Sequence, residues 1–220
     1  MKNFKFYLKE DLVDVKYGKL TQEDEQKIDE SDKIISQFNK NGILQKYKNM
    51  KMPSPNETAE EIKELKQIMA NATDDDLFFA ISAEVDENKM YFDFAKSHGL
   101  HLPPDFIRNI FDQTDPILFY LKKYYNRARP EQFAAANNIP FQVEIANNAL
   151  HPACPSGHAL DSFLMDHFLS KMIKNKRKEI SDFCEKMRMS RVHVGLHYLS
   201  DNEMSRILAK DLIESKLIEI

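Results

Sequence analysis

Residues 155–216 read PSGHALDSFLMDHFLSKMIKNKRKEISDFCEKMRMSRVHVGLHYLSDNEMSRILAKDLIESK, and their apolar positions recur at helical spacing. Ser156 suits the N-cap of the first helix in this stretch, because its hydroxyl can accept a free backbone N–H. Ser200 and Glu203 have the spacing of a capping box for the last helix. The helices predicted here span residues 157–174, 177–190 and 201–216. The C-terminal part of the chain is therefore expected to be α-helical.

The rest of the chain is also expected to be α-helical. Alternating β-branched patterns are nearly absent, and glycine occurs only five times in 220 residues, so strands have little support. Further helices are predicted over 22–39, 57–71, 74–97, 105–111 and 115–129. Pro116 suits the first position of the last of these, and Pro130 ends it. The apolar face of 74–97 is expected to hold Leu77, Phe78, Ile81, Val85 and Phe92. Residues 131–154 are predicted to form a long loop.

Composition limits the classes of protein. The chain has 31 Lys and Arg against 35 Asp and Glu, a net charge of −4, and 42% hydrophobic residues. No long basic block indicates a nucleic-acid surface. No apolar run approaches the roughly 18 residues of a transmembrane helix, and the start lacks the apolar stretch of a secretory signal. We expect one domain, 1–220, located in the cytoplasm. In it, a helical extension (1–72) packs on a core (100–217).

Three short blocks in the C-terminal half carry polar residues suited to chemistry. They are Lys122 followed by Arg129-Pro130, then Pro155-Ser156-Gly157-His158, then Ser190-Arg191 followed by His197 and Asp201. Lys122, Arg129 and Arg191 together supply three positive charges, and a guanidinium can bind phosphate oxygens bidentately. Ser156 and Gly157 stand at a predicted helix N-terminus, which favours anions. The residues therefore predict a phosphate-binding site.

The order and spacing of the blocks resemble the signature of the type 2 phosphatidic acid phosphatase superfamily, KxxxxxxRP, PSGH and SRxxxxxHxxxD. This superfamily includes class A acid phosphatases, lipid phosphatases and vanadium-dependent haloperoxidases. The resemblance covers roughly residues 115–215 and implies an all-α helical bundle. It implies that His197 is the nucleophile, that Asp201 orients it, and that His158 is the general acid. Lys122, Arg129, Ser156, Gly157 and Arg191 would bind the phosphate.

The implied function is hydrolysis of small phosphate monoesters through a phosphohistidine, without a metal or other cofactor and with vanadate as an inhibitor. One alternative is a vanadium-dependent haloperoxidase, in which vanadate is the cofactor. Another is a helical protein that binds phosphate without turnover. The substrate and the oligomeric state stay open, a homo-oligomer included.

A metal site is the third alternative, because His193, His197 and Asp201 follow at intervals of four residues. It requires an unbroken helix. On such a helix Arg191 and His197 would lie about 240° apart and could not face one phosphate. Gly195 instead predicts a break, with His197 in a turn before the last helix. Apolar residues of the predicted loop are expected to contact the leaving group, namely Phe133, Phe141, Val143 and Ile145.

Overall fold

The computed structural model describes residues 12–29, 32–40, 42–145 and 150–218. Its elements are α-helices, and the described residues contain no named β-strand, only an isolated bridge between Lys16 and Arg127. The helices are α1 (Gln22–Asp29), α2 (Asp32–Asn39), α3 (Ile43–Asn49), α4 (Pro55–Asn71), α5 (Asp74–Ser97), α6 (Phe106–Tyr125), α7 (Pro130–Ala136), α8 (Gly157–Met172), α9 (Arg177–His193) and α10 (Leu199–Glu214). The predicted all-α class is confirmed.

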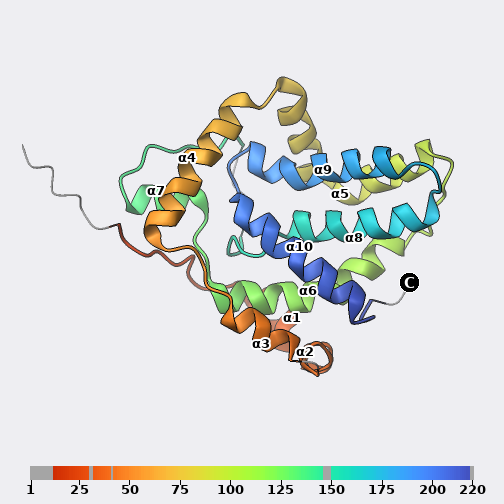
Figure 1. Ribbon diagram of the computed structural model, residues 1–220, viewed down its shortest axis with the longest axis horizontal. Helices are drawn as coiled ribbons and strands as arrows, with labels where there is room; N and C mark the ends of the chain where they lie inside the picture. Colours follow the sequence, from red (N-terminus) through yellow and green to blue (C-terminus); the bar gives the residue numbers. More distant parts are fainter. Residues whose placement is uncertain (1–11, 30–31, 41, 146–149, 219–220) are drawn as a thin grey trace, which may run out of the picture.

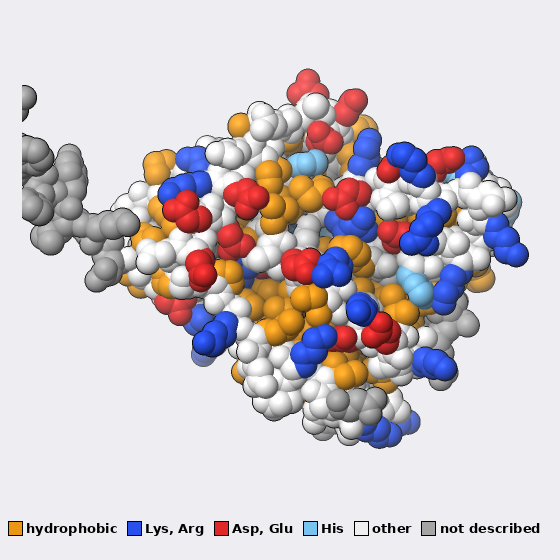
Figure 2. Space-filling model, in the orientation of Figure 1, with side chains coloured by type: hydrophobic (Ala, Val, Ile, Leu, Met, Phe, Trp, Pro, Cys, Tyr) orange, Lys and Arg blue, Asp and Glu red, His pale blue; other side chains and the backbone are white. Residues whose placement is uncertain are grey.

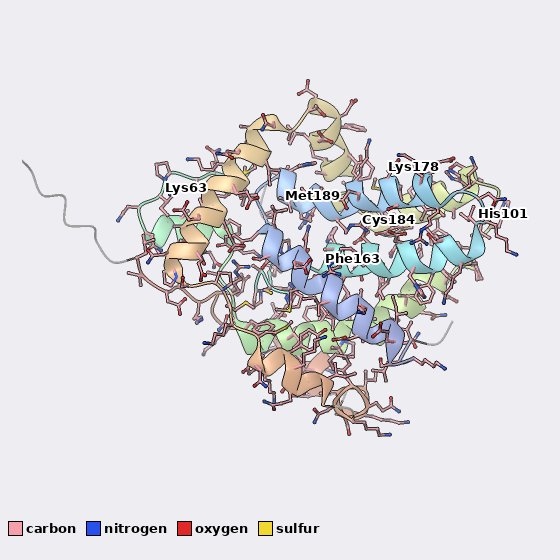
Figure 3. All side chains as sticks on the ribbon, viewed as in Figure 1. Lys63, His101, Phe163, Lys178, Cys184 and Met189 are labelled. Atoms are coloured by element: carbon pink, nitrogen blue, oxygen red, sulfur yellow. The ribbon has the colours of Figure 1, made fainter. Side chains whose placement is uncertain are left out.

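Helices α8, α9 and α10 form the centre of the molecule, with α5 packed against α9 and α6 against α8 (Figure 1). Their apolar faces meet in one core that includes Leu121, Leu164 and Leu208. Cys184 of α9 is buried on the side that faces α8, whereas Lys178 of the same helix points outward (Figure 3). This central packing fixes the helix ends that carry the three sequence blocks.

The N-terminal helices lie against α6 and α10 (Figure 1). The phenol of Tyr47 donates a hydrogen bond to Asp211 at 2.7 Å, and Tyr125 donates one to the Tyr47 carbonyl at 2.7 Å. Helix α4 begins with a capping box formed by Ser54 and Glu57. These contacts attach residues 43–71 to the motif-bearing helices.

Two predicted boundaries are wrong. Helix α6 runs without interruption through Pro116, where two helices were expected. Its buried face continues across the proline through Ile110, Ile117 and Leu121, and this burial offsets the hydrogen bond that proline cannot make. The expected loop 131–154 contains α7, which starts at Pro130 and buries Phe133.

Helix α5 also differs from its expected packing. Phe78, Ile81 and Val85 of the predicted apolar face are 73%, 47% and 80% exposed, whereas Leu77 and Phe92 of the same face pack against buried clusters. The buried positions are the small Ala80 and Ala83 together with two residues beyond them, Tyr91 and Ala95. Aromatic rings contribute to the contact with α9, because Phe79, Tyr91 and Phe94 of α5 all lie against the Phe183 ring.

The surface carries both signs of charge. On the face shown in Figure 2, Lys and Arg side chains are interspersed with Asp and Glu over much of the surface. No helix in the described part of the chain is both long and apolar enough to cross a membrane.

Candidate active site

The third block lies at a break between two helices, as its sequence predicts. Helix α9 ends at His193, and α10 begins at Leu199. Gly195 has φ +81°, a conformation that L side chains rarely adopt, and a Cβ there would lie 2.9 Å from the Met69 side chain. The turn places His197 in the interior, where it is 3% exposed. It also removes the continuous helix that the metal-site alternative required.

The capping box predicted at Ser200 and Glu203 does not form. The N-cap of α10 is Tyr198, whose backbone N–H donates to the Asp201 carboxylate at 3.0 Å. Glu203 instead pairs with Arg206 on the surface. Asp201 therefore stands in the first turn of α10, buried, with its carboxylate directed back toward the turn.

His197 is held from both ring nitrogens. Its Nδ1 lies 3.0 Å from Asp201 Oδ2, and its Nε2 lies 2.8 Å from Arg129 Nη1. A guanidinium only donates hydrogen bonds, so Nε2 is the acceptor and the ring proton is on Nδ1. Burial, together with the charge of Arg129, keeps the pKa of His197 well below its usual value. The ring is therefore neutral, and the Nε2 lone pair that a nucleophile would use accepts the hydrogen bond from Arg129 in this structure.

Arg127 is the main electrostatic partner of Asp201. Its Nη1 lies 2.6 Å from Asp201 Oδ1, and its Nη2 lies 2.5 Å from Glu61 on α4. Burial by itself would raise the pKa of Asp201, but Arg127 and His197 outweigh it and hold the pKa below its usual range. The guanidinium also stacks 3.9 Å from the Tyr198 ring centroid. Asp201 is thus an ionised carboxylate inside the protein.

Lys122 and Arg129 stand on either side of the turn between α6 and α7. Lys122 Nζ donates to the Pro152 carbonyl at 2.7 Å, and Arg129 donates to the carbonyls of His151 and Leu196, both at 2.9 Å. Both cations are 3% exposed. Burial lowers the pKa of Arg129 to about 10, which still leaves it charged at neutral pH. The residues after α7 therefore supply backbone acceptors to the site.

Ser156 and His158 belong to the start of α8. Ser156 is the N-cap, fully buried, and its hydroxyl accepts from the Ala159 N–H. Gly157 follows it as the first residue of the helix. His158 Nε2 lies 3.5 Å from Glu87 of α5. Burial above all, then the charges of Arg129 and Lys122, lowers the pKa of His158 to about 4.

Arg191, near the end of α9, completes the predicted set. It is 5% exposed, and its guanidinium contacts the Glu84 carboxylate of α5. Burial lowers its pKa to about 10. The charges of Lys122 and Arg129 lower the pKa values of both His158 and His197. Direct contacts join α8 and α9 to α5 through the pairs His158–Glu87 and Arg191–Glu84. Other contacts join the α6–α7 turn to His197 and Asp201.

Four charged residues of this cluster are absent from the predicted set: Glu61, Glu84, Glu87 and Arg127. Arg127 lies two residues before Arg129, and the spacing of the first block selects Arg129 instead of Arg127. The three glutamates lie on α4 and α5, far from the blocks in sequence, and have no local signal. No three His, Cys, Asp or Glu residues among the described ones are arranged to hold a metal ion.

The apolar residues that were expected to contact the leaving group pack against small buried clusters. Phe133 packs in a small core with Ile62 and Tyr198 instead of lining a loop, and Phe141 lies partly buried against the same core. Val143 and Ile145 pack against Val194 and Leu196 beside the turn. A cavity of about 560 Å³ lies elsewhere, between α8 and α10, and is lined in part by Phe163, His167 and Ile213.

Buried cations around a histidine–aspartate pair form a site that suits a small anionic ester. Comparison with family models agrees: residues 113–210 match the PAP2 superfamily, a range that includes all three blocks. This match supports the type 2 phosphatidic acid phosphatase superfamily for this part of the chain, and members of that superfamily are generally phosphoesterases. A search of curated proteins found no match.

Proposed function

We propose that the protein hydrolyses phosphate monoesters through a phosphohistidine on His197. The observation that carries this proposal is the alignment of Arg129, His197 and Asp201, which leaves Nε2 unprotonated and in contact with the Arg129 guanidinium. Phosphoryl transfer depends mainly on positioning and on stabilising charge on the transferred oxygens. Lys122, Arg129 and Arg191 supply that charge, so the chemistry needs no metal ion.

The reaction has two steps. His197 Nε2 attacks phosphorus, a P–N bond forms, and the P–O bond to the alcohol breaks while His158 gives its proton to the leaving oxygen. A water molecule then attacks phosphorus and gives a proton to His158. The P–N bond breaks, and inorganic phosphate leaves. Asp201 stabilises the positive charge that the His197 ring gains in the first step.

Hydrolysis of p-nitrophenyl phosphate by the full chain in excess chelator tests this proposal. We expect turnover that chelator does not reduce and that vanadate inhibits, because vanadate resembles the pentacoordinate phosphoryl group. Loss of activity in chelator, with recovery on adding a metal, would contradict the metal-free mechanism. If no ester is hydrolysed, bromide oxidation with vanadate and peroxide would identify the haloperoxidase alternative.

The pH dependence should separate esters by their leaving group. Only protonated His158 can donate a proton, and with a pKa of about 4 its protonated fraction rises about tenfold per unit as the pH falls from 7 to 5. An alkyl alkoxide needs that proton, whereas p-nitrophenolate leaves readily without it. The kcat/KM ratio of ethyl phosphate to p-nitrophenyl phosphate should therefore rise over this range. A ratio independent of pH would argue against His158 as the acid.

A further inference from the structure

Helix α5 is interrupted where it borders the site. Asp86 has non-helical backbone angles (φ −160°, ψ 84°), and its carboxylate accepts the Lys89 N–H at 2.8 Å, which caps the second half of the helix. Glu84 and Glu87 stand on either side of this interruption. Glu84 contacts Arg191, and Glu87 lies 3.5 Å from His158. One segment of α5 therefore brings two carboxylates to a site that otherwise binds an anion.

This segment lies on the side where the alcohol of an ester would leave. In the proposed reaction the leaving oxygen meets His158. The His158 ring contacts α5 twice, through the Ala83 backbone and through Glu87. The carbon atoms attached to that oxygen would therefore face residues 83–87.

In the proposed reaction, phosphate would replace Glu84 as the partner of Arg191. In the structure its carboxylate contacts Arg191, one of the cations expected to bind phosphate. A bound phosphate that takes this guanidinium leaves Glu84, only 25% exposed, without its counter-charge. A positive group on the substrate would replace the guanidinium. Burial, with a smaller contribution from Asp115, raises the pKa of Glu87 to about 8, so Glu87 carries little negative charge at neutral pH.

We propose that Glu84 is a specificity-determining residue that selects phosphate monoesters of amino alcohols, binding the ammonium group when phosphate displaces it from Arg191. This inference rests on the proposed phosphatase function. It adds the class of leaving group, which the phosphate-binding residues do not define.

The test compares O-phosphorylethanolamine with ethyl phosphate, which lacks only the amine. We expect the unchanged protein to prefer the amine by at least about tenfold in kcat/KM, in line with a charge-assisted hydrogen bond. Glu84→Gln should lower kcat/KM for phosphorylethanolamine. It should raise kcat/KM for ethyl phosphate, because a neutral amide competes less for Arg191. Glu64→Gln, which removes a charge from an exposed position on α4, is the matched control and should leave the preference intact.

The outcomes separate the two proposals. If p-nitrophenyl phosphate is hydrolysed but the unchanged protein shows no preference for the amine, or Glu84→Gln keeps the preference, the specificity inference is wrong. If the unchanged protein hydrolyses none of the three esters, the phosphatase proposal fails, and this inference fails with it. Circular dichroism of both variants distinguishes a lost preference from a lost fold.

Discussion

Replacing His197 by alanine is expected to lower kcat for phosphate esters at least about a thousandfold. The variant loses the atom that forms the P–N bond, and neighbouring cations cannot substitute for it. Rates measured with p-nitrophenyl phosphate in chelator would show the loss. Denaturing the protein at high pH during turnover of a labelled ester should trap a phosphorylated species in the unchanged protein and none in the variant.

His193→Ala is the control for this change. His193 ends α9, four residues before His197, and lies outside the contacts that hold the His197 ring. The phosphohistidine mechanism predicts that this variant keeps its activity, whereas the metal-site alternative predicts that both variants lose activity together with bound metal. Equal losses in the two variants would therefore overturn the assignment of the nucleophile.

Replacing Arg127 by alanine is expected to cost about 3–5 kcal/mol of unfolding free energy. Arg127 is 7% exposed and joins Asp201, which is fully buried, to Glu61. Its removal leaves a carboxylate inside the protein without its main counter-charge. Urea unfolding monitored by circular dichroism measures the change. The variant should also lose activity, because without Arg127 the Asp201 carboxylate is no longer held in its ionised form.

Arg108→Ala supplies the comparison. Arg108 pairs with Asp112 on the surface of α6, where it is 77% exposed, and such pairs contribute less than about 1 kcal/mol. A loss in Arg127→Ala no greater than that in Arg108→Ala would show that Asp201 is stabilised by other contacts.

Much of the helical content could be predicted from sequence because it depends on local signals. Ser156 is the N-cap of α8 as its position in the sequence predicts, and Gly195 lies in the turn that places His197 in the interior. The predictions failed where tertiary packing overrides local preference. Helix α6 continues through Pro116 because the apolar face on both sides of it is buried.

The residues of the candidate site could be predicted where they occupy the spacings of the three sequence blocks. Block spacing names Lys122, Arg129, His158, Arg191, His197 and Asp201, and the structure shows direct contacts from Arg129 to His197 and from His197 to Asp201. Their chemical roles remain predictions. Spacing could not indicate Glu61, Glu84 or Arg127, because their importance comes from which helices pack together. A charged residue on an amphipathic helix has the same appearance in sequence whether it faces solvent or a buried guanidinium.

The ion pairs from Glu61 through Arg127 to Asp201 connect the segment that matches the family model to a helix outside it. The segment that matches the family model, 113–210, does not contain all the charged residues of the candidate site. Arg127, the counter-charge of Asp201, lies inside the segment, but the Glu61 carboxylate that pairs with Arg127 lies upstream of it. The acidic neighbours of His158 and Arg191 also come from upstream helices. Grafting the three blocks onto another helical scaffold would transfer the signature residues without these acidic neighbours. Divergence in the upstream helices could therefore retune the chemistry while every signature residue stays the same.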